Sequence, residues 1–279
     1  MKVFKPTSPG RRGMTGINFR ELLSGDRPYK PLVKGVKRGF GRNNDGRITT
    51  RHKGSGAKRK SRDVSFDYLK KDIPARVETI EYDPNRTSFI SLVVFNDGAR
   101  QYRLAPRELK VGDEFTLSET AKAVPGNALP IGKIPAGVPI FNIEFQVGGG
   151  GKLARSAGES AEVIAQEEER TLVKLPSKET RYVSSRAWAT VGSLSCEEYR
   201  FVTIGKAGRH RHMGVRPTVR GAAMNAVDHP HGGGEGKAPQ GTKRPKNKWG
   251  KIRYGVKTRK AKKYSNKFIV STRKQAKRK

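Results

Sequence analysis

The sequence predicts a mainly β body, residues 63–200, between two long, irregular and basic extensions, residues 1–62 and 201–279. The first observation behind this prediction is the distribution of charge. The body holds 18 of the 59 Lys and Arg and 20 of the 25 Asp and Glu side chains, so the extensions carry the net charge of +34. The second is a series of short strand patterns in the body, separated by turn signals. Because like charges repel and few apolar groups are available to bury, we expect the extensions not to stay compact alone.

Apolar periodicity and turn residues predict the strands of the body. Residues 89–95 form a β-branched and aromatic run, and Asp97-Gly98 separates it from residues 100–104, which is a strong hairpin signal. Residues 141–147 alternate apolar and polar side chains, the period-two pattern of a half-buried strand. Further strands are predicted over residues 76–82, 114–117, 162–165, 171–175, 180–183 and 187–191, and single helical turns near 153–156 and 195–199.

Four prolines, at positions 125, 130, 135 and 139, indicate a junction within the body. They predict two small β-units, approximately residues 63–120 and 125–200. Small open or closed barrels of this size are common among nucleic-acid-binding proteins. One continuous sandwich of about 140 residues is the alternative.

Composition limits the classes of function. Hydrophobic residues make up 34% of the chain, enough for one or two small cores but not for a large one. The single cysteine, Cys196, excludes a disulfide framework and a cysteine-based zinc site, and fits a reducing, intracellular setting. Since no apolar run reaches 18 residues and the first residues lack a signal-peptide pattern, we expect neither a membrane span nor a secretion signal. A net charge of +34 requires a polyanionic partner, with nucleic acid favoured over an acidic membrane surface.

The N-terminal extension has the composition of an RNA-binding segment. Residues 5–12 and 41–52 interleave Arg and Lys with Gly, Asn and Thr. Glycines let the backbone approach RNA closely, and Asn and Thr can bond phosphate or the ribose hydroxyl. A solvated basic tail without defined contacts is the alternative. The glycine-rich residues 53–60 and 148–152 lack the spacing of a P-loop, so nucleotide hydrolysis is not predicted.

The C-terminal extension contains two His-x-His pairs, at 210/212 and 229/231. With no Cys and few acidic residues nearby, a zinc site is disfavoured. Asp228 precedes His229, but adjacency in sequence does not give the hydrogen bond that a general base needs, and no serine or cysteine stands out as a nucleophile. His229 is therefore only a weak catalytic candidate, and an RNA-packed glycine-rich loop over residues 227–236 explains more of these residues.

These stretches resemble the large-subunit ribosomal protein L-two family, in its bacterial form, almost from end to end. The most specific is Asp-His-Pro-His-Gly-Gly-Gly-Glu-Gly at residues 228–236. Other matching stretches are residues 5–12, 41–53, 73–84, 104–113, 125–130, 153–158, 205–209, 216–221 and 267–270. The sequence departs from the family's usual residues at Ala57 (usually His), His212 (usually Trp), Ala226 (usually Pro) and Asn247-Lys248 (usually Thr-Pro).

The resemblance implies an oligonucleotide-binding-type (OB) barrel over residues 63–120 and an SH3-like barrel over 125–200, with residues 1–62 and 201–279 entering ribosomal RNA. It implies a structural, non-enzymatic constituent of the large ribosomal subunit that supports assembly, subunit association through an intersubunit bridge, tRNA binding and the peptidyl-transferase region. Participation of the family in peptide-bond formation has been proposed and disputed. The implied partners are large-subunit ribosomal RNA, small-subunit ribosomal RNA at the subunit interface and neighbouring ribosomal proteins, in the cytoplasm, with no membrane and no homo-oligomer. No cofactor or protein-bound metal is expected, apart from structural magnesium shared with the RNA.

Basic motifs and the resemblance together select the residues expected to bind RNA. A structural ribosomal RNA-binding protein is the leading hypothesis, because the motifs of the extensions do not fit an acyl-transfer enzyme using Asp228 and His229, or a free-standing nucleic-acid chaperone or membrane-surface protein. The expected RNA-binding residues are Lys5, Arg11, Arg12, Arg42, Asn43, Asn44, Arg47, Arg51, His52, Lys53, Lys58, Arg59, Lys206, Arg209, Arg211, Arg216, Arg220, Asn225, Asp228, His229, His231, Gly232, Gly233, Gly234, Trp249, Arg253, Lys257 and Arg259.

Overall fold

The computed structural model describes residues 1–25, 27–36, 39–236, 240–273 and 275. The chain forms two compact units. The β unit comprises Met1–Lys37, Lys58–Lys206 and Lys267–Lys279, and the arm unit comprises Arg38–Ala57 and Ala207–Asn266. Each predicted extension therefore contributes to both units. None of the described helices is long and apolar enough to cross a membrane.

The first main sheet of the β unit has four antiparallel strands in the order β7-β6-β5-β8. They are β5 (Ala75–Glu81), β6 (Ile90–Phe95), β7 (Arg100–Leu104) and the short β8 (Glu114–Phe115). The predicted hairpin at Asp97-Gly98 is confirmed, since Gly98 has φ of +79° and the N–H of Phe95 donates to the carbonyl of Ala99. The strands predicted over residues 76–82, 89–95 and 100–104 are confirmed as β5, β6 and β7.

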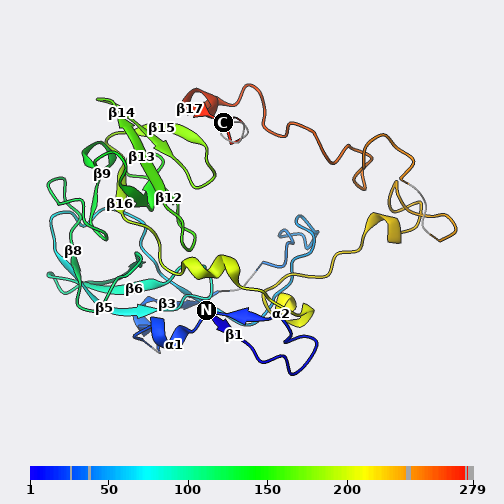
Figure 1. Ribbon diagram of the computed structural model, residues 1–279, viewed down its shortest axis with the longest axis horizontal. Helices are drawn as coiled ribbons and strands as arrows, with labels where there is room; N and C mark the ends of the chain where they lie inside the picture. The colour runs from blue at the N-terminus through cyan, green and yellow to red at the C-terminus, as the bar shows by residue number, and fades with distance from the viewer. Residues whose placement is uncertain (26, 37–38, 237–239, 274, 276–279) are drawn as a thin grey trace. The chain divides into compact units, whose positions relative to one another are not determined.

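The second main sheet has seven strands in the order β17-β15-β14-β13-β10-β16-β9, and Figure 1 shows β13, β14 and β15 side by side. All of its pairings are antiparallel. The strands predicted over residues 162–165, 171–175, 180–183 and 187–191 are confirmed. The members of this sheet are β9 (Ala128–Pro130), β10 (Pro139–Phe141), β13 (Ala161–Gln166), β14 (Arg170–Lys174), β15 (Thr180–Ser184), β16 (Trp188–Val191) and β17 (Ile269–Ser271).

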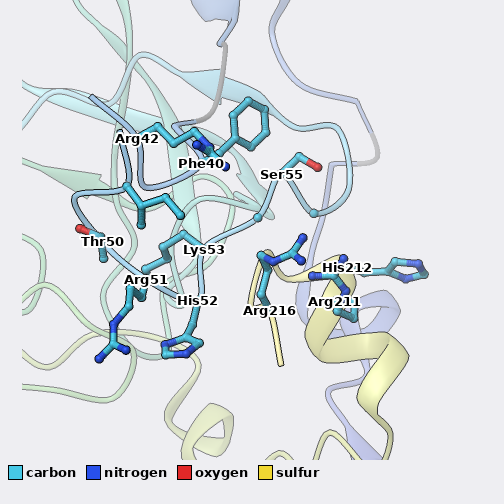
Figure 2. Close-up of a pocket in the computed structure, with 13 residues that line it drawn as sticks. Phe40, Arg42, Thr50, Arg51, His52, Lys53, Ser55, Arg211, His212 and Arg216 are labelled. Atoms are coloured by element: carbon cyan, nitrogen blue, oxygen red, sulfur yellow. The ribbon is translucent and has the colours of Figure 1, made fainter. Parts of the chain in front are cut away.

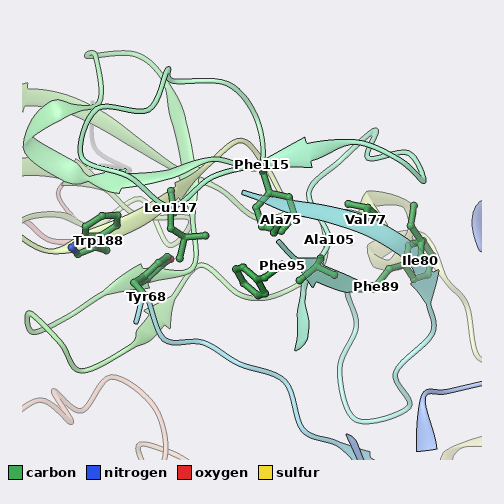
Figure 3. Close-up of a cluster of buried hydrophobic side chains, with 12 residues drawn as sticks. Tyr68, Ala75, Val77, Ile80, Phe89, Phe95, Ala105, Phe115, Leu117 and Trp188 are labelled. Carbon is green, nitrogen blue, oxygen red and sulfur yellow. The ribbon is translucent and has the colours of Figure 1, made fainter. Parts of the chain in front are cut away.

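Each main sheet covers its own group of buried apolar side chains. The first group, drawn in Figure 3, includes Val77, Phe95 and Phe115 from the four-stranded sheet. It also includes Trp188 of β16, whose ring stacks on Tyr68 at 5.9 Å between ring centroids. The second group lies within the seven-stranded sheet and its connections, where the 3-10 helix η2 (Ile131–Lys133) contributes buried Ile131. The prediction of a mainly β body with small cores is confirmed.

The prediction of one continuous strand over residues 141–147 is wrong. Strand β10 ends at Phe141, Asn142 has φ of +50°, and β11 (Ile143–Glu144) pairs instead with β12 (Gly151–Leu153). The chain can turn here because both polar side chains are buried with partners. The amide of Asn142 donates to the hydroxyl of Tyr68 at 3.0 Å, and the carboxylate of Glu144 accepts from three backbone N–H groups.

The two predicted helical turns have opposite outcomes. Residues 153–156 are not helical, because β12 ends at Leu153 and Ala154 has φ of +49°. The turn predicted near residues 195–199 is present, displaced by two residues, as the 3-10 helix η3 (Glu197–Phe201).

Part of the N-terminal extension belongs to the β unit and packs on its four-stranded sheet. The N–H groups of Ser24 and Gly25 donate to the carbonyl of Ile80, and the N–H of Tyr29 donates to the hydroxyl of Tyr102 at 2.7 Å. The side chain of Met14 is buried, so this segment does supply apolar groups. Its elements are the pair β1 (Lys2–Val3) and β2 (Thr15–Gly16), helix α1 (Phe19–Leu22), the 3-10 helix η1 (Lys30–Leu32), and the pair β3 (Val33–Gly35) and β4 (Lys60–Arg62).

The arm unit has little regular structure. It contains helix α2 (Ala207–His212) and the 3-10 helix η4 (Gly221–Ala223). Another 3-10 helix, η5 (Tyr264–Phe268), begins in the arm unit and extends two residues past its last residue, Asn266. Turns and backbone hydrogen bonds define the rest of its described residues.

Candidate nucleic-acid interface

Backbone hydrogen bonds join the two segments of the arm unit. The N–H of Gly54 donates to the carbonyl of Gly214 at 2.9 Å, and the N–H of Arg216 donates to the carbonyl of His52 at 3.0 Å. The 80 residues of the unit carry 21 basic and 3 acidic side chains. The sequence predicted these segments as parts of two separate extensions, whereas the structure makes them one cationic unit.

A cleft of about 610 Å³ opens in this unit, and we call it the basic cleft (Figure 2). None of the described residues that line it is acidic. The missing side chain of Gly54 leaves room for two cations of the cleft. A Cβ added there would lie 3.3 Å from Cγ of Arg216 and 3.6 Å from Nη1 of Arg211. The apolar side chains of Phe40 and Ile48 complete the wall. Predicted RNA-binding residues that line the cleft are Arg42, Arg51, His52, Lys53, Arg211 and Arg216.

A tight turn over residues 41–50 shapes one wall of the basic cleft. The side-chain oxygen of Asn43 accepts from the N–H of Arg47 at 2.8 Å. This oxygen of a predicted RNA-binding residue therefore stabilises the turn in which the residue lies. Gly41 has φ of +71°, and a Cβ there would lie 2.1 Å from the carbonyl oxygen of Thr50. Gly41 is therefore required by the chain's own backbone.

Residues 224–233 form a compact loop, which we call the histidine loop. It is closed by the N–H of Gly233, which donates to the carbonyl of Met224 at 3.0 Å. Inside it, Nδ1 of His229 accepts from the N–H of His231 at 3.0 Å, and the two imidazole centroids lie 5.0 Å apart. A Cβ on Gly232 would lie 2.3 Å from the carbonyl oxygen of Asn225, so this glycine also serves the chain's own packing.

The histidine loop does not contain an Asp–His catalytic pair. Asp228 is exposed, and no hydrogen bond joins its carboxylate to His229 or to another described residue. Elsewhere, burial and the neighbouring Glu198 raise the pKa of Cys196 to about 11, so its thiol is neutral near pH 7. No three His, Cys, Asp or Glu side chains of the described ranges gather into a group that could hold a metal ion.

Trp249 is an exposed aromatic platform between two cations. Its ring lies 5.3 Å from the guanidinium of Arg51 and 4.8 Å from Nζ of Lys248, and 65% of the residue is exposed. Its turn is held by Asn247, whose side-chain oxygen accepts from the N–H groups of Trp249 and Lys251 at 3.0 Å each. Aromatic rings with neighbouring cations suit the stacking of unpaired bases.

The other predicted residues are dispersed. Six belong to the β unit, where Arg59 donates to the carbonyl of Pro84 at 2.6 Å. In the arm unit, Arg259 donates to the side chains of Ser265 and Asn266, so its guanidinium stabilises a turn. The remaining five of the β-unit group are Lys5, Arg11, Arg12, Lys58 and Lys206. Those of the arm unit outside the cleft, the histidine loop and the Trp249 turn are Asn44, Arg47, Arg209, Arg220, Gly234, Arg253 and Lys257, of which all but Arg209 are exposed.

A pair of arginines on the β unit, Arg86 and Arg155, is not among the residues predicted to bind RNA. The guanidinium carbons of Arg155 and Arg86 lie 4.3 Å and 5.2 Å from the ring centroid of Phe66. Burial and the charge of Arg86 lower the pKa of Arg155, and Arg86 is held by the buried carboxylate of Asp83 at 2.6 Å. Two like charges against one ring favour an anion as a further partner. Charge composition does not mark these residues, because each is an isolated arginine in a segment of balanced charge.

Comparison with protein-family models finds two matches. The model described as "Ribosomal Proteins L2, RNA binding N-terminal domain" matches residues 29–116, and "Ribosomal Proteins L2, C-terminal domain" matches residues 124–250. Together they cover more than half of the chain. These two matches confirm the resemblance to the family. Together with the two main β-sheets described above, they also confirm the predicted OB-type barrel followed by an SH3-like barrel. The chain belongs to the ribosomal protein L2 family, whose members are RNA-binding proteins of the large ribosomal subunit.

Proposed function

We propose that this protein holds ribosomal RNA chiefly through the arm unit, with the basic cleft as its main phosphate-binding site. The observation that carries the proposal is the gathering of cationic side chains from residues 42–53 and 211–216 around one cleft with no acidic residue among its described lining. Arginine suits this role because its planar, permanently charged guanidinium bonds phosphate oxygens in pairs.

The structure supports cation placement before RNA arrives. The bonds that join the two segments of the cleft are made by backbone groups, so they use no guanidinium. Arg42 donates to the carbonyl of Gly46 at 2.7 Å within its own turn, which leaves Arg51, Arg211 and Arg216 as the main phosphate-binding cations. A binding site with prepositioned groups loses less conformational entropy on binding. We propose Trp249 and Phe40 as stacking surfaces for unpaired bases at the same unit.

We propose a second contact on the β unit, where a backbone phosphate lies between Arg86 and Arg155. The support is their convergence on Phe66 and the lowered pKa of Arg155, which an added anion would reverse.

Family membership supports finer roles, which we propose for this chain. They are early binding during subunit assembly, an intersubunit bridge that touches small-subunit ribosomal RNA, support of tRNA binding, and a structural rather than catalytic part in the peptidyl-transferase region. We also propose a cytoplasmic location in the ribosome, contacts with neighbouring ribosomal proteins, no self-association, and no cofactor beyond magnesium shared with RNA. The barrel boundaries are proposed at residues 63–120 and 125–200, between the extensions 1–62 and 201–279.

The test is RNA binding by the full chain over a range of salt concentrations. The variant R51A/R211A/R216A removes three cleft cations without touching the backbone bonds that join the segments. If each contacts one phosphate, the slope of log affinity against log salt becomes shallower by about 2, and affinity falls about 100-fold at fixed salt.

The matched control is K110A/K122A/R186A, which likewise removes three exposed cations, all of the β unit and outside every proposed contact. We expect it to change affinity less than about threefold. Equal losses in the cleft variant and the control would show that only total charge matters, and would overturn the basic cleft as a site.

A further inference from the structure

The hydrogen bonds of the histidine loop assign a tautomer to each of its imidazoles. Because Nδ1 of His229 accepts the N–H of His231, that nitrogen carries no proton, and the single proton of the neutral ring is on Nε2. His231 is the reverse case. Its Nε2 accepts from the N–H of Lys246 at 3.1 Å, so its proton is on Nδ1.

Gly221 provides the surface on which the His229 ring lies. A Cβ at Gly221 would lie 2.4 Å from Cε1 and Nδ1 of His229 and 2.5 Å from Nε2, closer than real contacts allow. The glycine begins η4, and the N–H of Met224 donates to its carbonyl, so the turn leads directly into the histidine loop. Any larger residue at position 221 must displace the imidazole.

The two histidines therefore differ in what they can offer to a partner. His231 is 7% exposed and is tied to the backbone of Lys246, so it braces the loop internally. His229 is only half-buried, and its Nε2 makes no hydrogen bond with any residue of the described ranges. The N–H on that nitrogen is the loop's available imidazole donor.

We propose that Gly221 and the N–H of His231 are positioning groups that fix His229 as a hydrogen-bond donor, through Nε2–H, to an oxygen of the RNA backbone. This inference rests on the proposed function, since the oxygen belongs to bound RNA. It also gives a physical reason against proton abstraction by His229. A general base must aim a free lone pair at its substrate, but the lone pair of this ring faces the N–H of His231.

The first test uses the full chain without RNA, labelled with ¹⁵N in histidine. Two-bond ¹H–¹⁵N correlation spectra distinguish the two tautomers, and the variants His229→Asn and His231→Asn assign the signals among the five histidines. We expect the Nε2–H form at His229 and the Nδ1–H form at His231. The Nδ1–H form at His229, or the tautomer mixture of a solvent-exposed histidine, would overturn the inference.

Gly221→Ala tests the positioning role with the imidazole still present. We expect the fixed tautomer signature of His229 to be lost. Its matched control is Gly208→Ala in α2 of the same unit, where an added Cβ meets no atom within 4 Å and the signature should be kept. An unchanged His229 spectrum in Gly221→Ala would contradict the positioning role.

The second test separates the two nitrogens of His229 by RNA binding. In His229→Asn the amide oxygen replaces Nδ1 as the acceptor for His231 but the donor is lost, whereas in His229→Gln the amide N–H reaches the place of Nε2. We expect the Asn variant to bind RNA about tenfold more weakly and the Gln variant to retain more affinity. Wild-type affinity in the Asn variant would refute the donor contact. If the wild-type chain itself fails to bind RNA, the proposed function fails while the tautomer result still stands.

Discussion

Replacing Glu144 by Leu should remove the main polar support of the junction between β10 and β11. Its buried carboxylate accepts from the N–H groups of Gly148 at 3.3 Å, Gly150 at 3.1 Å and Trp188 at 3.1 Å. The Trp188 N–H is buried and would lose its partner, at about 2 kcal/mol, whereas the two glycine N–H groups lie nearer to water and contribute about 1 kcal/mol each. We therefore expect a loss of about 4 kcal/mol in the free energy of unfolding.

For a unit of this size, that loss corresponds to a decrease in Tm of about 8–16 °C. The measurement is thermal unfolding followed by the fluorescence of Trp188, in a Trp249→Phe background so that only one tryptophan reports. Glu144→Gln keeps one acceptor oxygen and should lie between Leu and the wild type. Glu119→Gln, at an exposed carboxylate paired with Lys133, is the control and should leave Tm within about 2 °C. A decrease below about 3 °C for Glu144→Leu would refute the assignment of Glu144 as the junction's hydrogen-bond acceptor.

Three further predictions concern reactivity, order and catalysis. Alkylation of Cys196 at pH 8 should be about 100-fold slower in the folded chain than in urea, because a pKa raised from 9.0 to about 11 lowers the thiolate fraction by that factor; equal rates would contradict it. Limited trypsin digestion without RNA should cut first at the exposed Lys and Arg side chains of the arm unit and leave residues 58–206, with residues 1–37 still bound, because those side chains lie in turns with little regular structure; resistance of the whole chain would count against this. Ribosomes shown to contain His229→Asn should form a peptide bond in a single turnover within about threefold of the wild-type rate, whereas loss of a general base would slow it about 10²–10⁴-fold.

Local signals in the sequence predicted the regular part of the fold. The Asp97-Gly98 turn depends on two adjacent residues and their flanking strands, so it needed no tertiary information. The alternation over residues 141–147 was a different case. A polar residue in an alternating run reads as exposed, but Asn142 and Glu144 are buried and find hydrogen-bond partners far away in the sequence, at Tyr68 and Trp188. Sequence periodicity cannot distinguish a solvated polar side chain from a buried one whose partners come from elsewhere in the fold.

The glycines of the extensions show the same limit at the candidate site. The sequence predicted that they permit close approach by RNA, since a missing side chain leaves room for any neighbour. At Gly41 and Gly232 the neighbour is the chain's own carbonyl oxygen, and at Gly221 it is the ring of His229. These glycines shape the arm unit itself, and the RNA contacts proposed here come from the side chains that they position.

Two departures from the family's usual residues meet at one place in the arm unit. The N–H of Ala57 donates to the carbonyl of His212 at 2.8 Å, and this bond is one of those that join the two segments of the unit. The resemblance gives histidine and tryptophan as the usual residues at these positions, so both departures lie on opposite sides of a single contact. Because backbone atoms make the bond, neither change removes it. The segments of the basic cleft can therefore keep their pairing while the side chains around the pairing vary.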